Sequence, residues 1–330
     1  MTAGSARALA HPNIAFIKYW GNANADLRLP SNGSISLTLG GLDTRTRVSF
    51  DPDLRQDTIT VDGHALSGEA EKRVVRVLDH IRQLARVGAR ARVESRNSFP
   101  TGAGLASSAS GFAALALAAT RAAGLSLDTQ ELSRIARLGS GSACRSAWGG
   151  YVEWLAGRNH AGSYAVQIAP PEHWDIRDVV AIVSRRPKAV GSSEGHALAA
   201  GSPLQAQRIA DAPRRLAVCR DAIVQRDFTS LAGIVEEDSD LMHAVMASST
   251  PPLTYSTPVS LAIQRAVRQW RSEGLPTAYT QDAGPNIHVL CLPEAEDMIT
   301  TRLRSIAGVL DLIHTAPGGP AREIEFDDPE

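Results

Sequence analysis

The stretch SFPTGAGLASSAS at residues 98–110 runs directly into the Ala/Leu-rich segment GFAALALAATRAAG at residues 111–124. Glycine and alanine leave room for backbone N–H groups to approach an anion closely. A helix starting there adds unpaired N–H donors and the positive end of its dipole. Ser107, Ser108 and Ser110 supply hydroxyl groups in the same turn. The order of glycine loop, serine cluster and helix therefore predicts a phosphate-binding loop, and with it a nucleotide site.

This loop belongs to neither of the common glycine-rich phosphate-binding types. A P-loop would place a lysine after its last glycine, and no lysine follows here. A dinucleotide fingerprint would need a third glycine, but Gly102 and Gly104 are followed by Ser107. On this segment alone, a plain turn in front of a core helix stays the alternative, and the neighbouring motifs have to decide.

The composition is that of a globular protein with two domains, because 330 residues exceed what one core usually fills. A net charge of −1 argues against a surface dedicated to nucleic acid or to a membrane. The three cysteines are far apart and form no disulfide or zinc pattern, which suits a reducing compartment. The first residues show no signal-peptide pattern, and no apolar span approaches the ~20 residues of a membrane helix. We therefore expect a cytoplasmic protein.

Hydrophobic periodicity predicts a mixture of strands and helices. Alternation over residues 44–62 predicts a β-hairpin, and an apolar stripe over 69–87 predicts an amphipathic helix. Asp128 is the expected N-cap of a helix over 127–138. The turn-rich segment 188–195 indicates a domain boundary nearby. Further expected elements are strands over 91–95, 177–184, 277–280 and 287–292, and helices over 202–234 and 258–273.

Four short segments place polar side chains among small residues, where a core would need bulk. Lys18 stands between an apolar strand and Tyr-Trp-Gly, which indicates a cation in a cleft, although such a lysine is more often a surface charge. Arg145 follows the run GSGSAC at 139–144, and this donor-rich pattern suits a carboxylate or phosphate; a helix cap with a surface arginine is the alternative. Asp282 lies in a Gly-Pro turn, where an aspartate more often forms the turn than catalyses. The segment GSSEG at 191–195 is by itself typical of a turn.

Taken together, these motifs resemble those of the GHMP kinase superfamily and, within it, of the mevalonate diphosphate decarboxylases. The matching segments span most of the chain in the family's order, and the decarboxylase-type motifs are far more specific than the glycine loop. They are NIAFIKYWG at 13–21, LPSNGSISLTL at 29–39, FPTGAGLASSASGFAAL at 99–115, GSGSACRSAWGG at 139–150 and YTQDAGPN at 279–286.

The resemblance implies a two-domain α+β GHMP kinase fold with the active site in the cleft between the domains. An N-terminal domain of the ribosomal protein S5 domain 2 type would span residues 1–185, and an α+β C-terminal domain would span 186–322, before an acidic tail at 323–330. The resemblance also implies ATP and Mg²⁺ as cofactors, a small phosphorylated mevalonate as substrate, and a homodimer. It implies no nucleic-acid or membrane partner.

Roles for single residues follow from the same resemblance. Asp282 is expected beside the C3 hydroxyl as base or orienting group, Arg145 on the C1 carboxylate, and Lys18 near the phosphates. Ser107 is expected near the transferred γ-phosphate and Mg²⁺. The residues expected around the ATP phosphates are Pro100, Gly102, Ala103, Gly104, Ala106, Ser107, Ser108 and Ser110. The residues expected to line the substrate, besides Arg145, are Tyr19, Asn22, Ser140, Ser142, Ser192 and Ser193.

Two positions depart from the family pattern and bear on the substrate. Diphosphate-using members typically carry lysine where this chain has Asn22, and bacterial members often carry arginine where it has Ser193. Losing two charge-assisted hydrogen bonds of about 1.5–3 kcal/mol each weakens diphosphate binding by on the order of 10²–10⁴. We therefore expect a phosphomevalonate decarboxylase, which converts mevalonate 5-phosphate to isopentenyl phosphate. Mevalonate 5-diphosphate stays the alternative, because eukaryotic members lack the second arginine and Arg28, Arg185 or Arg186 could replace the lost charge.

Two further protein classes remain open: a mevalonate-type kinase that does not decarboxylate, and a non-catalytic relative that only binds ATP. The presence of both Asp282 and Arg145 favours the decarboxylase over the kinase, because elimination needs a held carboxylate as well as proton handling. The intact loop, together with Lys18 and Asp282, disfavours the non-catalytic relative.

Overall fold

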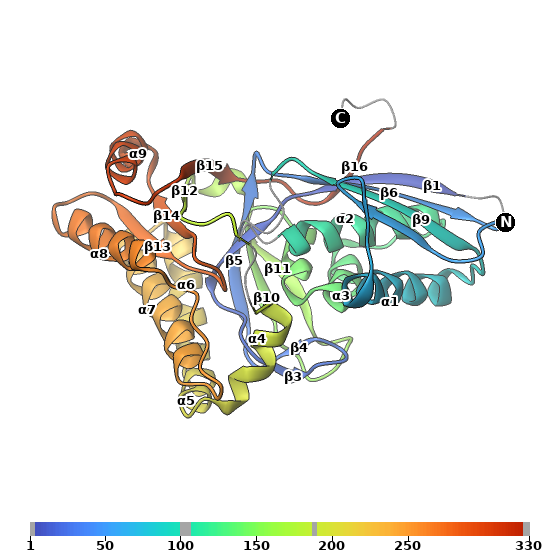
Figure 1. Ribbon diagram of the computed structural model, residues 1–330, viewed down its shortest axis with the longest axis horizontal. Helices are drawn as coiled ribbons and strands as arrows, with labels where there is room; N and C mark the ends of the chain where they lie inside the picture. Colours follow the sequence, from blue (N-terminus) through green and yellow to red (C-terminus); the bar gives the residue numbers. More distant parts are fainter. Residues whose placement is uncertain (1–3, 100–106, 187–189, 326–330) are drawn as a thin grey trace.

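The computed structural model describes residues 4–99, 107–186 and 190–325 and has the predicted α+β architecture (Figure 1). A sheet backed by helices α1, α2 and α3 forms one side of the molecule, near the N-terminus. A larger sheet with the later helices forms the other side. Strand β5 lies in the middle of the molecule (Figure 1).

The first sheet has six strands in the order β16-β1-β6-β9-β7-β8. Every second side chain of β6 and β9 is buried, as the alternating sequence predicts. The predicted hairpin over 44–62 is wrong, because β6 pairs with β1 and β9 while β7 pairs with β9 and β8. Alternation fixes the buried face of a strand but does not name its partner. The strands are β1 (Ser5–Ala10), β6 (Thr44–Asp51), β7 (Thr58–Val61), β8 (His64–Ala65), β9 (Arg90–Asn97) and β16 (Arg322–Glu323).

Three helices cover the inner face of this sheet: α1 (Gly68–Ala85), α2 (Ser107–Ala122) and α3 (Thr129–Gly139). The Ala-rich helix α2 packs on β1 and β6 because its small side chains allow close approach. Asp128 caps α3 as predicted and accepts a hydrogen bond from the Glu131 N–H at 2.8 Å. A Cβ at Gly139 would lie 2.0 Å from the Phe112 ring, so the end of α3 sits directly against α2.

The second sheet has eight strands, in the order β11-β10-β5-β15-β12-β14-β13 with β2 paired to β5. Strands β2, β12 and β14 are almost continuously apolar and are buried along their length. The strands are β2 (Asn13–Ile17), β5 (Ser34–Gly40), β10 (Tyr151–Leu155), β11 (Tyr164–Ala169), β12 (Arg177–Ile182), β13 (Thr277–Thr280), β14 (Ile287–Cys291) and β15 (Asp311–Pro317). A small separate pair is formed by β3 (Asn22–Asn24) and β4 (Leu29–Pro30).

The later helices pack on this second sheet, with α6 and α7 against β2 and with α8 against β13 and β14. Helices α6 and α7 bury a core that includes Phe16, Ile35 and Leu37, and α8 buries a second core on β13 and β14. The helices are α4 (Ser192–Leu198), α5 (Gln205–Ala210), α6 (Ala212–Gln225), α7 (Phe228–Ala247), α8 (Pro258–Ser272) and α9 (Glu296–Arg304). A 3₁₀ segment, η1 (Gly141–Ala147), directly follows α3.

The division into domains at residues 185 and 186 stays a prediction. Strand β12 pairs with β14 and β15, so it lies with strands from the later part of the chain. Strand β15 in turn pairs with β5, which joins both parts of the chain in one sheet. The chain then returns to the first sheet, where β16 pairs with β1. Residues 326–330 of the expected acidic tail lie outside the described residues.

Among the described residues, the three cysteines are buried and free. Within the same ranges, no group of histidine, cysteine and acidic side chains has a geometry that could hold a metal ion. No helix in the described part of the chain is long and apolar enough to cross a membrane.

Candidate active site

Nine of the site residues predicted from the sequence meet in one cleft of about 370 Å³. It opens between the end of β2, the loop after β13, segment η1, and helices α1 and α4. Its lining includes Lys18, Tyr19, Arg28, Arg73, Ser108, Ser140, Ser142, Arg145, Ser192, Ser193, His196 and Asp282. Motifs that are up to 264 positions apart in the sequence therefore form one site.

An ion pair between Lys18 and Asp282 occupies one end of the cleft, with Lys18 Nζ donating to Asp282 Oδ1 at 2.6 Å. The Lys18 side chain is 1% exposed, whereas that of Asp282 is 30% exposed. The lysine side chain is therefore enclosed by the protein, whereas the carboxylate is exposed to the cleft. A carboxylate in this position can accept a proton from a bound hydroxyl or orient that hydroxyl.

A buried charge network fixes Lys18. Its backbone N–H donates to Asp238 Oδ2 at 2.6 Å, and its carbonyl accepts from Arg208 Nη2 at 2.9 Å. Asp238 is fully buried on α7 and also accepts from Arg215 Nε at 2.7 Å. Because both backbone groups of Lys18 are held, the start of its side chain has little freedom.

Side chains of the surrounding loop fix Asp282. The neighbouring Gln281 donates through its backbone N–H to Ser239 Oγ at 3.0 Å and through its amide to the Gly284 carbonyl at 2.8 Å. Asn286 accepts from the backbone N–H groups of residues 183 and 184 at 2.8 and 3.1 Å, which ties the turn to the end of β12. The Gly-Pro turn is therefore rigid and presents Asp282 to the cleft.

Burial and neighbouring charges act in opposite directions on this carboxyl. Burial raises the pKa of Asp282, but the neighbouring positive charges, above all that of Lys18, outweigh it, and the net pKa lies below its ordinary value. Burial also lowers the pKa of Lys18, against the opposing effect of Asp282. The aspartate is thus ionised at neutral pH, and it is a better orienting group than a strong base.

Arg145 forms a second charged group at the floor of the cleft. Its Nε and Nη1 donate to Ser36 and Ser34 at 2.9 and 2.6 Å, and its Nη2 donates to Asn13 Oδ1 at 2.9 Å. These partners are neutral, and within the described residues no acidic side chain lies within ion-pair distance of this arginine. The guanidinium is buried, so its uncompensated positive charge favours an anion such as a carboxylate.

The serine cluster at the start of α2 is split by the fold. Ser108 faces the cleft and lies 3.2 Å from Ser140 Oγ, which lines the same cleft with Ser142. The structure corrects the expectation for Ser110, which is fully buried and bonds to Thr44 Oγ1 at 2.6 Å. Two helical positions separate it from Ser108, which turns it about 200° around the helix axis, away from the cleft and into the core. The expected phosphate-loop residues Pro100, Gly102, Ala103, Gly104 and Ala106 lie outside the described residues.

An apolar cavity of about 250 Å³ adjoins the cleft on the other side of Ser108. Ser107, the metal and phosphate residue of the sequence prediction, lies at its edge rather than in the cleft itself. The cavity is lined mainly by aliphatic and aromatic side chains and shares Arg73 with the cleft. Its apolar lining includes Ile59, Val61, Leu66, Val74, Phe112 and Leu115. No sequence motif indicated this cavity, because its walls come from ordinary strand and helix residues.

Tyr19 and Asn22 form part of the opposite wall. The Tyr19 hydroxyl donates to Asn22 Oδ1, and burial raises the pKa of this phenol to about 12, so it stays protonated. Asn22 thus contributes through Tyr19 and is absent from the lining itself. Ser192 and Ser193, at the start of α4, do line the cleft.

Two arginines outside the motifs quoted above also line the cleft. Arg28 and Arg73 donate through their Nε atoms to the carbonyls of Leu138 and Gly139, at 3.2 and 2.8 Å. These carbonyls lie at the C-terminus of α3, where helix geometry leaves them without internal partners. Burial and the proximity of Arg28 lower the pKa of Arg73 to about 10, which still leaves it charged at neutral pH.

The sequence had suggested Arg28 as a replacement cation, but it gave no signal for Arg73. Arg73 lies one helical turn before the buried Val77, at the edge of the apolar face of α1, and no motif marks it. The other two suggested replacements, Arg185 and Arg186, are exposed and absent from the cleft lining, and Arg185 pairs with Asp311 at 2.7 Å.

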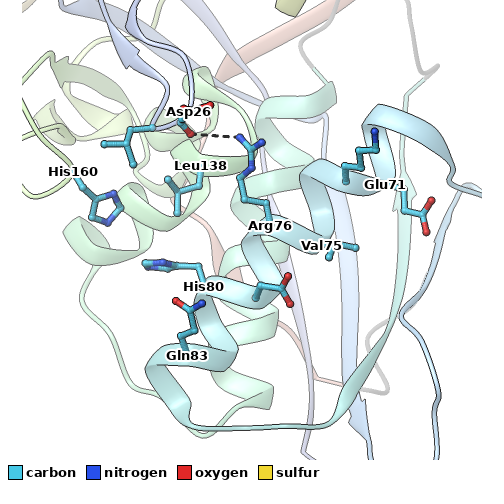
Figure 2. A pocket seen from close by; sticks show the side chains of 11 residues that line it. Asp26, Glu71, Val75, Arg76, His80, Gln83, Leu138 and His160 are labelled. Carbon is cyan, nitrogen blue, oxygen red and sulfur yellow. Dashed lines mark hydrogen bonds between the residues drawn. The ribbon is translucent and has the colours of Figure 1, made fainter.

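The loop that carries Arg28 borders a separate hollow of about 780 Å³ over α1 (Figure 2). The Arg76 side chain reaches across it and donates to the Asp26 carbonyl at 3.4 Å. Arg137 donates to the Leu27 carbonyl and to His160 Nδ1 beneath the same loop. The loop between β3 and β4 is therefore held at both Asp26 and Leu27 before it delivers Arg28 to the cleft.

Comparison with known proteins gives the same family over both parts of the chain. Residues 10–165 match the family of the diphosphomevalonate decarboxylase-like N-terminal domain. Residues 178–321 match the family of the mevalonate 5-diphosphate decarboxylase C-terminal domain.

Individual relatives agree with these matches. The diphosphomevalonate decarboxylase of Schizosaccharomyces pombe is 40% identical over 315 residues, which is 89% of this chain and 80% of the relative. That of Homo sapiens is 38% identical over 305 residues, which is 86% of this chain and 75% of the relative.

Solved structures extend the similarity to the fold. The mevalonate diphosphate decarboxylase of Staphylococcus aureus has a TM-score of 0.94 at 36% identity, covering 98% of this chain and 99% of that one. A structure described as MDDEF in complex with MVAPP, AMPPCP and magnesium has a TM-score of 0.92 at 37% identity, covering 98% of this chain and 100% of that one.

Proposed function

Because this chain belongs to the mevalonate diphosphate decarboxylase family, we propose that it catalyses the ATP-dependent decarboxylation of mevalonate 5-diphosphate to isopentenyl diphosphate. The observation that carries the proposal is the juxtaposition of the Lys18–Asp282 pair with the unpaired Arg145 in one cleft. A hydroxyl-directed carboxylate and a carboxylate-binding guanidinium are the two groups that this elimination needs.

Asp282 acts on the C3 hydroxyl of the substrate. Its carboxylate is ionised and anchored by Lys18, so it orients the hydroxyl and accepts its proton as the oxygen bonds to phosphorus. Lys18 in turn compensates the charge that develops on the oxygens of the transferred phosphoryl group. The rigid turn around Asp282 makes this placement independent of substrate binding.

Arg145 holds the C1 carboxylate. Hydrogen bonds to Ser34, Ser36 and Asn13 fix its guanidinium. The positive charge is therefore available to the bound carboxylate, and the fixed guanidinium restricts the orientation of that carboxylate. Holding the carboxylate in one orientation aligns the C1–C2 bond, which breaks, with the departing oxygen at C3. The electrons of that bond form the alkene as CO₂ and phosphate leave.

The described residues fit ATP and Mg²⁺. The apolar cavity beside Ser108 suits an adenine, and Arg73 stands where it opens into the cleft. Bound ATP supplies the phosphoryl group that makes the tertiary hydroxyl a leaving group. Since no acidic or histidine cluster among the described residues could hold a metal alone, Mg²⁺ would be held mainly by phosphate oxygens, with Ser107 as a protein ligand.

The charge of the cleft supports a diphosphate, and the expectation of a monophosphate substrate is not supported. The curated relatives are named for the diphosphate substrate. Arg28 and Arg73 supply two cations in place of those missing at Asn22 and Ser193. Neither arginine has an acidic partner within ion-pair distance in the described part of the chain. Their terminal nitrogens are thus available to a second phosphate group.

The experiment compares kcat/KM for mevalonate 5-phosphate and 5-diphosphate while recording ADP and CO₂ together. We expect equal amounts of ADP and CO₂, and a preference for the diphosphate of about 10-fold or more. Arg73→Met should reduce that preference, whereas Arg185→Met, outside the cleft, should leave it unchanged. A preference of the wild type for the monophosphate would overturn the substrate proposal, and ADP without CO₂ would identify a kinase.

Homodimer formation and a cytoplasmic location are further proposals that rest on the family resemblance and on the sequence pattern alone.

A further inference from the structure

His196 lies in the wall of the cleft and has no role in the mechanism derived above. It belongs to the short helix α4 and is half-buried against two aromatic rings. Its imidazole lies 4.1 Å from the Tyr19 ring and 4.7 Å from the Trp20 ring between centroids, tilted by 32° and 35°. The rings of Tyr19 and Trp20, which directly follow Lys18 in the chain, therefore hold the imidazole in one plane.

The backbone of both partners is built for this contact. A Cβ at Gly195 would lie 2.5 Å from Trp20 Cη2, so only a glycine lets α4 approach Trp20 this closely. Gly21 has a φ of +96°, a backbone conformation that glycine adopts without strain. That N–H donates to His196 Nδ1 at 2.9 Å.

This hydrogen bond fixes the tautomer. Because Nδ1 accepts from Gly21, it must carry a lone pair, and the single ring proton must lie on Nε2. Burial, together with the charges of Arg28 and Arg208, lowers the pKa of His196 to about 3, so the ring stays neutral at physiological pH. Among the described residues, Nε2 has no hydrogen-bond partner, and it is not one of the fully enclosed polar atoms. His196 therefore offers one fixed N–H donor to the cleft.

The other functions of a histidine do not fit this geometry. A base with so low a pKa is a poor proton acceptor at neutral pH. In the described part of the chain, no third ligand accompanies His196 that would make a metal site. A neutral donor, in contrast, suits an anionic ligand that is already surrounded by cations.

The position of His196 identifies the part of the substrate that it meets. The Tyr19 ring that packs against His196 donates through its hydroxyl to Asn22, and Arg28 and Arg73 line the same cleft as both rings. Arg28 and Arg73 mark the end of the cleft assigned above to the diphosphate. On the basis of the proposed function, we propose that His196 is a specificity-determining residue whose Nε2–H donates to a phosphate oxygen at the 5-position of the substrate.

Two substitutions separate this role from packing. His196→Asn keeps an acceptor near the position of Nδ1 for Gly21 but removes the Nε2 donor, whereas His196→Gln keeps a donor near Nε2. We expect His196→Asn to raise the KM for mevalonate 5-diphosphate about 10- to 100-fold, with kcat and the KM for ATP within about 2-fold of the wild type. We expect His196→Gln to recover most of the lost affinity.

His173→Asn is the matched control, because His173 contacts the Ile223 carbonyl outside the cleft and should leave the substrate KM unchanged. Equal KM values for wild type and His196→Asn would overturn the role of His196. Equal losses in both His196 variants with an unchanged kcat would also overturn it, because they would assign the effect to ring packing. A wild type that turns over neither phosphorylated mevalonate would instead refute the proposed function.

A second measurement does not depend on turnover or on the folding of a variant. In wild-type protein labelled with ¹⁵N-histidine, His196 should show the Nε2–H tautomer from about pH 5 to pH 8. Its Nε2 signal should shift when inorganic pyrophosphate or mevalonate 5-diphosphate is added. An Nδ1–H tautomer, or an Nε2 signal that both ligands leave unchanged, would refute the proposed donor.

Discussion

Asp282→Asn tests the chemistry and the electrostatics of the cleft in one substitution. Asparagine keeps the volume and one acceptor oxygen, so the change removes the charge and little else. Losing the carboxylate that orients the hydroxyl and accepts its proton should lower kcat by about 10²–10⁴-fold. ADP and CO₂ release should fall together, because both depend on the same oriented hydroxyl.

The same substitution leaves Lys18 with an unpaired charge. Lys18 is 1% exposed, and its ammonium bonds to Asp282 at 2.6 Å. Breaking a buried pair costs about 3–5 kcal/mol, but the lysine can limit the cost by releasing its proton, which takes about 4 kcal/mol at pH 7.5. The exposure of Asp282 and the nearby Asp238 reduce the cost, so we expect a loss of about 2–4 kcal/mol. For 330 residues this corresponds to about 3–6 °C in Tm.

The double variant Lys18→Met/Asp282→Asn distinguishes the two effects. Methionine fills the buried position without a charge, so the Tm should return to within about 2 °C of the wild type while activity stays lost. Steady-state kinetics and thermal melting of the three proteins are sufficient for the test. Turnover of Asp282→Asn within 10-fold of the wild type would refute the role of Asp282. A Tm equally low in the single and double variants would refute the assignment of the cost to Lys18.

Two other outcomes follow from the site. Arg145→Lys keeps the charge but cannot bond to Ser34, Ser36 and Asn13 at once, so we expect kcat to fall about 10²-fold in steady-state kinetics; an unchanged kcat would contradict the need for an oriented carboxylate. Burial lowers the pKa of His243 in the folded protein to about 4, whereas in the unfolded chain it has its ordinary value of about 6.5. As the pH falls, the unfolded chain is therefore protonated at this histidine first. The contribution of the neutral His243 to the free energy of unfolding is fully present above about pH 6.5 and is lost as the pH falls toward 4. His243→Gln should therefore show a smaller drop in Tm than the wild type between pH 7 and pH 4.5, and an equal drop would contradict this assignment.

The sequence predicted best those features that depend on residues adjacent in the chain. The helix after the glycine loop and the Asp128 cap are confirmed, because periodicity and capping are local properties. The predicted hairpin over 44–62 is wrong, because the choice of β9 as the common neighbour depends on the whole sheet. The burial of Ser110 also escaped prediction, since only helix geometry decides which serine of a cluster faces inward.

The motif residues Lys18, Arg145 and Asp282 were predicted individually, but their relation to one another was not. No spacing rule indicates that Lys18 pairs with Asp282 or that Arg145 has neutral partners only. These facts determine the chemistry, because a paired carboxylate orients a hydroxyl and an unpaired guanidinium binds an anion. They arise where β2, the loop after β13, and η1 converge, and this depends on the strand order of the second sheet.

The choice between one phosphate and two shows the same limit most clearly. Along the chain, Asn22 and Ser193 remove two cations, and each removal weakens binding of a second phosphate. In space, a loop held by Arg76 and Arg137 brings Arg28 to the cleft, and the edge of the apolar face of α1 brings Arg73 there. Both end on adjacent carbonyls of α3, so they are fixed relative to each other before any ligand binds. Binding responds to the charges that surround the ligand, and the elements that supply them can differ between relatives whose motifs align. A changed motif residue therefore predicts a changed substrate only when no other element brings the same charge to the same place.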